Sequence, residues 1–89
     1  MHYEEAWKHL NEILSIYERE FGEHDTATAD CMFTNALVTY KRNHTHEALD
    51  DMQRCLMIYT NTLGEYDNKT REVEETIRSI NQYLKQAEQ

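Results

Sequence analysis

The chain has 89 residues, with 17 acidic side chains against 9 basic ones and a formal net charge of −8. This length allows a single domain. The acidic excess argues against binding to nucleic acid or to an anionic membrane surface, because few cations are available to neutralise phosphates. No apolar run approaches the roughly 20 residues of a membrane span. Two glycines, no proline and 39% apolar residues favour an all-α protein.

The first predicted helix covers residues 3–21, where apolar side chains recur at spacings of three and four. They form one stripe consisting of Tyr3, Trp7, Leu10, Leu14, Tyr17 and Phe21. Ala6 and Ile13 widen the stripe, so this helix should bury a broad face. Gly22 is predicted to end the helix as a left-handed cap, and Asp25 or Thr26 to cap the next helix.

Three further helices follow with the same spacing of apolar residues. The second is predicted over residues 26–42 and should end at Asn43, which tolerates a positive φ. The third covers residues 45–63 and ends at Gly64. The fourth begins after Asp67 or Asn68. Because the connections are short, neighbouring helices should be antiparallel.

An internal repeat links the two halves of the chain. Shifting the sequence by 42 residues matches nine identical residues in the 24 positions from Glu5 to Thr28. The matches include Leu14 with Leu56 and Tyr17 with Tyr59. Chance would supply about one or two matches, so the chain carries a repeat of 42 residues, present slightly more than twice.

The segment from Phe21 to Thr28, the helix after it and Glu47-Ala48 resemble the tetratricopeptide repeat, most closely the variety in kinesin light chain and its relatives. Arg54-Cys55-Leu56-Met57-Ile58 and Leu63-Gly64-Glu65-Tyr66-Asp67-Asn68-Lys69-Thr70 stand where those repeats carry their two characteristic segments. The resemblance implies helices in the order B-A-B-A. It divides the chain into a partial repeat (1–24), a full repeat (25–66) and a terminal capping helix (67–89).

This order leaves the first helix without the A helix that would normally cover it. A stripe of Tyr3, Trp7, Leu10 and Leu14 should then be incompletely covered, and an exposed apolar patch of a few hundred Å² is typical of an interaction site. We therefore predict these four residues as an interface. We expect either that the chain is a piece of a longer array or that another chain, such as a second copy in a homodimer, covers this face.

The resemblance also implies a peptide-binding groove lined by the A helices. By position, the groove residues are Asp30, Phe33, Leu37, Tyr40, Lys41, Glu72, Glu75, Ser79 and Tyr83. Phe33 and Thr34 replace the paired Asn residues that clamp a peptide backbone in light-chain repeats. One Lys against three acidic groups should favour a basic or apolar segment.

No motif for catalysis, a cofactor or a metal accompanies these patterns. His44 and His46 lack a second ligand pair, and Cys31 and Cys55 lie within apolar stripes, as packed thiols of a reducing, cytoplasmic compartment would. The sequence therefore predicts a non-catalytic module for protein or peptide partners, a scaffold or adaptor segment. The alternatives are a helical appendage of a larger enzyme and an engineered repeat fragment.

Overall fold

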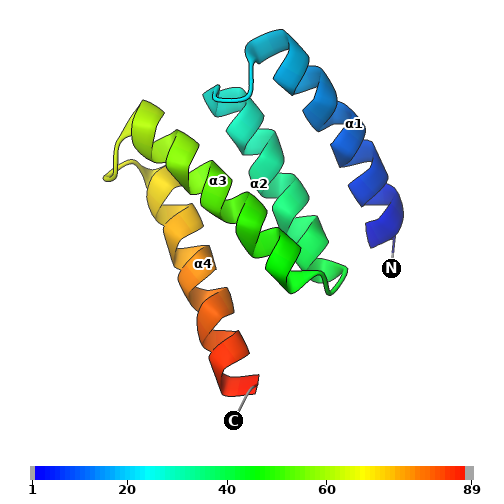
Figure 1. The fold of residues 1–89 in the computed structure, drawn as a ribbon, viewed down its shortest axis with the longest axis vertical. Helices are drawn as coiled ribbons and strands as arrows, with labels where there is room; N and C mark the ends of the chain where they lie inside the picture. Colours follow the sequence, from blue (N-terminus) through cyan, green and yellow to red (C-terminus); the bar gives the residue numbers. More distant parts are fainter. Residues whose placement is uncertain (1, 88–89) are drawn as a thin grey trace.

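The computed structural model describes residues 2–87, which form four α-helices joined by short turns (Figure 1). The helices are α1 (Tyr3–Phe21), α2 (Thr26–Lys41), α3 (Thr45–Leu63) and α4 (Asn68–Ala87). Successive helices run in opposite directions, and no strand occurs among the described residues. The prediction of an all-α fold built from helical hairpins is confirmed. Residues 1, 88 and 89 of the predicted repeat ranges lie outside the described residues.

The helix ends follow the turn residues, with two differences from expectation. Helix α2 ends at Lys41, one residue earlier than predicted, and Asn43 then takes a positive φ of 69°. Gly22 has φ 91° and ψ 162°, and Gly64 has φ 90° and ψ 163°. The prediction of a left-handed helical cap at Gly22 is therefore wrong in ψ. The chain turns through an extended conformation with positive φ that essentially only glycine adopts.

The turn after α1 and the turn after α3 are built alike. Thr28 donates its hydroxyl to the carbonyl of Gly22 at 2.7 Å, and Thr70 donates to the carbonyl of Gly64 at 2.8 Å. Asp25 caps α2 by accepting a backbone N–H at 2.8 Å, and Asp67 accepts the corresponding N–H at the start of α4 at 2.9 Å. The 42-residue repeat of the sequence is thus also a repeat of turn geometry.

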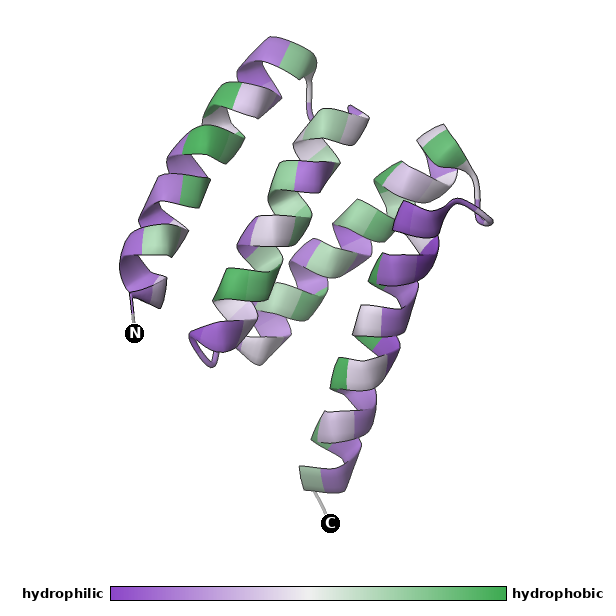
Figure 2. Ribbon diagram, turned by 180° about the vertical axis from the view of Figure 1, so that it is seen from behind, coloured by the Kyte–Doolittle hydropathy of each residue, from purple (hydrophilic) through white to green (hydrophobic). Residues whose placement is uncertain are grey.

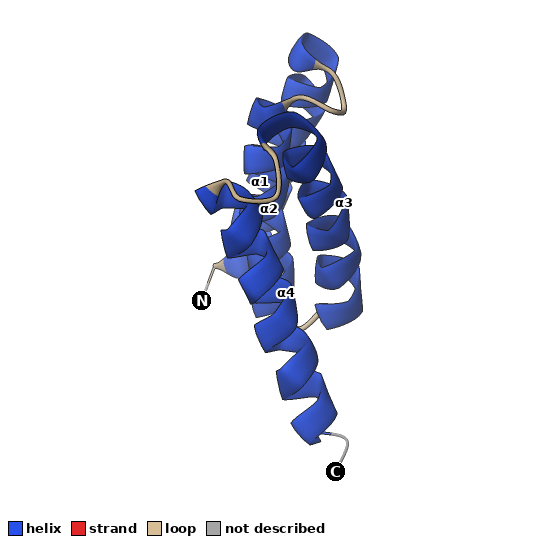
Figure 3. Cartoon of the chain, turned by 90° about the vertical axis from the view of Figure 1, so that its left-hand side faces the viewer, coloured by secondary structure: helices blue, strands red, loops and turns tan. Residues whose placement is uncertain are grey.

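The core lies between α2, α3 and α4. Helix α3 packs against both of the others, which lie on one side of it in Figure 3. The buried side chains of the core cluster are Ala29, Met32, Ala36, Met52, Cys55, Ile58, Tyr59, Val73, Ile77 and Ile80. Helix α1 packs on α2 and contains no buried residue. The described chain is a flat body of 44 × 33 × 16 Å with one helix covered far less than the rest.

Candidate interaction surfaces

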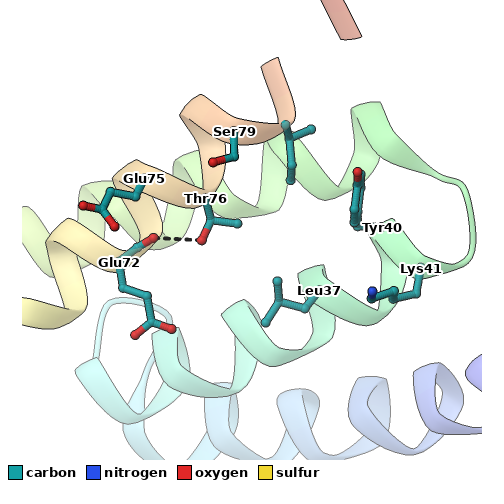
Figure 4. A pocket seen from close by; sticks show the side chains of 8 residues that line it. Leu37, Tyr40, Lys41, Glu72, Glu75, Thr76 and Ser79 are labelled. Carbon is teal, nitrogen blue, oxygen red and sulfur yellow. Dashed lines mark hydrogen bonds between the residues drawn. The ribbon is translucent and has the colours of Figure 1, made fainter. Parts of the chain in front are cut away.

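Helices α2 and α4 enclose a groove of about 420 Å³ (Figure 4). Leu37, Tyr40 and Lys41 line it from α2. The side from α4 consists of Glu72, Glu75, Thr76, Ser79 and Ile80. Figure 4 shows Leu37 and Glu72 reaching toward the space between the two helices. We call this site the α2–α4 groove. Its lining combines apolar side chains such as Leu37 and Ile80 with two carboxylates and one ammonium group.

A smaller hollow of about 150 Å³, lined by Asp30, Phe33, Tyr59, Lys69 and Glu72, continues the groove toward the start of α4. The Tyr59 hydroxyl donates a short hydrogen bond to Asp30. The Lys69 ammonium donates to both carboxylate oxygens of Asp30, at 3.1 and 3.0 Å. One carboxylate of α2 therefore ties together α3 and α4.

The environment of Tyr59 keeps its hydroxyl protonated. Burial is the main cause that raises the Tyr59 pKa, and the hydrogen bond to Asp30 and the charge of that carboxylate raise it further. The phenol is therefore a fixed donor over the ordinary pH range. It positions Asp30, and it is not a group poised for proton transfer.

The predicted groove residues divide between these two neighbouring spaces. Leu37, Tyr40, Lys41, Glu72, Glu75 and Ser79 line the larger space, and Asp30 and Phe33 line the smaller one. Tyr83 lies farther along α4, exposed and outside the lining of either space. Thr76 and Ile80 of the lining, and Tyr59 with Lys69, were not among the predicted groove residues. Lys69 and Thr76 lie three and four residues from Glu72, and Ile80 lies four residues beyond Thr76, so helical spacing was the available signal for these three. Tyr59 belongs to α3 and had no such signal.

A second hollow, of about 320 Å³, lies between α1 and α2. We call it the α1–α2 hollow, and it is lined by Leu10, Ile13, Tyr17, Ala27, Asp30, Cys31 and Thr34. Apolar residues recur along α1 from turn to turn (Figure 2). Ile13 is 41% exposed and its neighbour Ile16 is 46% exposed. Leu10, Ile13 and Tyr17 line the hollow together, and an apolar patch of several side chains, unlike a single exposed one, is typical of an interaction site.

Comparison of α1 with α3, its counterpart 42 residues later, shows what is missing. Cys55 and Ile58 of α3 are 0% and 6% exposed, whereas Ile13 and Ile16 at the equivalent positions of α1 are 41% and 46% exposed. Helix α3 is packed against both α2 and α4. Helix α2 lies beside α1 in the position that α4 occupies beside α3. The uncovered side of α1 is therefore the side equivalent to the one that α2 covers on α3.

The four predicted interface residues lie in different surroundings. Trp7 is half-buried, because the guanidinium carbon of Arg42 sits 4.1 Å from its ring centroid. Arg42 also donates to Glu4 at 2.8 Å and so fixes the start of α1 to the end of α2. Leu14 packs against the core cluster. Of the four, Leu10 alone lines the α1–α2 hollow.

Tyr3, the remaining member of the predicted interface, is half-buried and lies outside the lining of the hollow. Ile13 was predicted only to widen the stripe, and Ile16 was not singled out. The available signal in the sequence was the 42-residue repeat, which pairs Ile13 with Cys55 and Ile16 with Ile58. The Arg42 contact carried no signal, because it joins residues 38 positions apart.

The thiols and histidines show no arrangement for chemistry. Burial, chiefly, raises the pKa of Cys55 to about 12, and burial and the charge of Glu18 raise the pKa of Cys31, so both thiols stay protonated. His44 lies 3.7 Å from Glu47 at the exposed start of α3. Within residues 2–87, no three His, Cys, Asp or Glu side chains are placed to hold a metal ion.

The fold and surfaces together define a small helical-hairpin protein with an open apolar face and an acidic groove. Comparisons with known proteins found no matching family model, no similar curated protein and no similar solved structure. Among the described helices, none is both long enough and apolar enough to cross a membrane.

Proposed function

We propose that this chain is a non-catalytic protein-interaction module, a scaffold or adaptor segment of tetratricopeptide-like design that works in the cytoplasm. Its binding surface is the uncovered side of α1 together with the adjoining part of α2. A protein partner, or a second copy of the chain, docks there by burying apolar side chains. Nucleic acid is not among the proposed partners, because the net charge of −8 repels phosphates.

The single observation that carries the proposal is the contrast between equivalent residues of α1 and α3. The α1 positions keep large apolar side chains, Ile13 and Ile16, while losing the cover that their counterparts have. Because both side chains are already more than half covered, burying their exposed remainder contributes on the order of 1 kcal/mol each. The outer side of α4 differs, because Glu74 and Arg78 form an exposed ion pair there at 3.8 Å. This exposed part of α4 therefore carries charges where the uncovered side of α1 carries aliphatic side chains.

The test uses the full chain as bait in extract of the cells that express it, together with light scattering of the purified chain. Ile13→Glu places a charge on the open face, and Met57→Glu makes the same change at a 65% exposed position of α3 outside the hollow. We expect one species, a partner or a second copy, to bind to the wild type and to Met57→Glu but not to Ile13→Glu. Association that Ile13→Glu does not weaken, or the absence of any association, would contradict the proposal.

The α2–α4 groove is a second candidate docking site, favoured by its volume of about 420 Å³ and by its carboxylates Glu72 and Glu75. We propose an extended basic or apolar segment as its ligand. Replacing Glu75 with Gln should weaken binding of a basic peptide and reduce its dependence on salt. Unchanged affinity and salt dependence would remove the groove from consideration.

A further inference from the structure

The internal repeat indicates the shape of whatever covers α1. Three contacts seat α2 on α3: the Cys55 thiol donates to the carbonyl of Ala29 at 3.6 Å, Tyr59 donates to Asp30, and two hydroxyls meet near the helix ends. In the equivalent helix α1, Ile13 and Tyr17 stand in the places of Cys55 and Tyr59, and both line the α1–α2 hollow.

From this equivalence we infer that the α1–α2 hollow binds an amphipathic α-helix of the same type as α2, presented by a partner protein. This inference rests on the proposed function and names the partner's chemistry. The docked helix carries a small residue followed directly by an acidic one, as α2 does at Ala29 and Asp30. The small residue lies against Ile13, and the acidic one accepts a hydrogen bond from the Tyr17 hydroxyl.

The Tyr17 hydroxyl is available for this bond. It has no hydrogen-bond partner among residues 2–87, whereas the hydroxyl of its counterpart Tyr59 is bound to Asp30. The residue opposite Ile13 must be small, because Ile13 is larger than Cys55, which already contacts the backbone at Ala29. The hollow therefore requires a docked helix with a small residue next to a carboxylate. An apolar helix that lacks this pair of residues does not meet the requirement.

A folded second copy cannot supply this helix. In each copy Ala29 is 0% exposed and Asp30 is already bonded to Tyr59 and Lys69. Helix α2 would therefore have to detach from α3 and α4 before it could dock on another copy. The exposed side of α4 offers the ion pair of Glu74 with Arg78 in place of a small apolar stripe. Two copies also bring together charges of −8 each. A separate helix of neutral or positive charge suits the hollow better.

The probe is a synthetic peptide with the sequence of residues 25–42, capped at both ends and labelled for fluorescence anisotropy under reducing conditions. It is titrated with the full chain, as wild type, Tyr17→Phe and the matched control Tyr66→Phe, whose side chain is 81% exposed. A second peptide carries Asp30→Ala. Because a hydrogen bond to a charged group is worth roughly a factor of ten, each single change should weaken binding about tenfold. Tyr66→Phe should leave the affinity unchanged.

The decisive result is the double change. If the carboxylate meets Tyr17, the Asp30→Ala peptide should bind to wild type and to Tyr17→Phe with equal affinity. Independent effects would overturn the inference, as would binding no tighter than that of a scrambled peptide. Loss of binding with Tyr59→Phe but not with Tyr17→Phe would mean that the peptide occupies the position of α2 on α3. This result would also overturn the inference. If the peptide fails while Ile13→Glu still abolishes association, the proposed function stands and this inference falls.

Discussion

Replacing Asp30 with Ala should destabilise the fold more than an exposed carboxylate normally would. Tyr59 is 2% exposed, and leaving its hydroxyl without an acceptor costs about 1–3 kcal/mol. The ion pair with Lys69 joins side chains that are 44% and 51% exposed, so its loss adds about 0–1 kcal/mol. The better helix propensity of Ala returns roughly 0.5 kcal/mol. The net loss is about 2 kcal/mol, or a melting temperature lower by roughly 8–16 °C.

Urea unfolding followed by circular dichroism measures this loss, with Asp50→Ala as control because Asp50 is an exposed carboxylate of α3. Tyr59→Phe removes the donor along with the bond and should cost about 1 kcal/mol. The double variant Asp30→Ala/Tyr59→Phe should be no less stable than Asp30→Ala alone, because no buried hydroxyl is left unpaired. If the two losses add, or if Asp30→Ala behaves like Asp50→Ala, the reasoning is refuted.

Three further predictions concern the turns, the core thiol and the cover over Trp7. Gly22→Ala and Gly64→Ala should each cost about 1–3 kcal/mol in thermal unfolding, because both residues have φ near 90° although open space surrounds them. A loss at one glycine only would contradict the likeness of the turns. Burial raises the Cys55 pKa from 9.0 to about 12, so above pH 9 the unfolded chain releases this proton first and stability falls by about 1.4 kcal/mol per pH unit. Cys55→Ala should lack this extra alkaline loss in urea unfolding from pH 7 to 10.5, and parallel curves would contradict it. Arg42→Ala should cost about 1–2 kcal/mol and shift Trp7 emission to longer wavelength, since the Arg42 side chain is 13% exposed. An unchanged emission spectrum would show that Arg42 does not cover the ring.

The helices and turns could be predicted from the sequence because local rules determine them. Apolar spacing, Asp caps and the glycines at 22 and 64 mark the helix ends to within one residue. These local rules do not determine the ψ values of Gly22 and Gly64. Positive φ is compatible with both a helical and an extended ψ, and the buried hydroxyls of Thr28 and Thr70 accompany the extended one.

The open face could be predicted only in part. The apolar stripe of α1 is wider than one neighbouring helix can cover, so its pattern cannot tell which edge α2 takes. Trp7 and Leu14 lie on the covered edge, and Ile13 lies on the open one. The repeat aligns each α1 position with a position of α3, and the burial of those α3 residues in the structure then indicates which α1 positions are open. The groove was easier to place, since one face each of α2 and α4 supplies it.

Amide hydrogen exchange of the full chain, with and without a saturating amount of the peptide of residues 25–42, tests most directly whether the open face of α1 docks a helix. In the free chain, α1 should exchange fastest of the four helices, because none of its residues is buried. With peptide, exchange should slow in residues 10–17 and 27–34, which line the α1–α2 hollow. Slowing confined to α4, or no change in α1, would contradict the account.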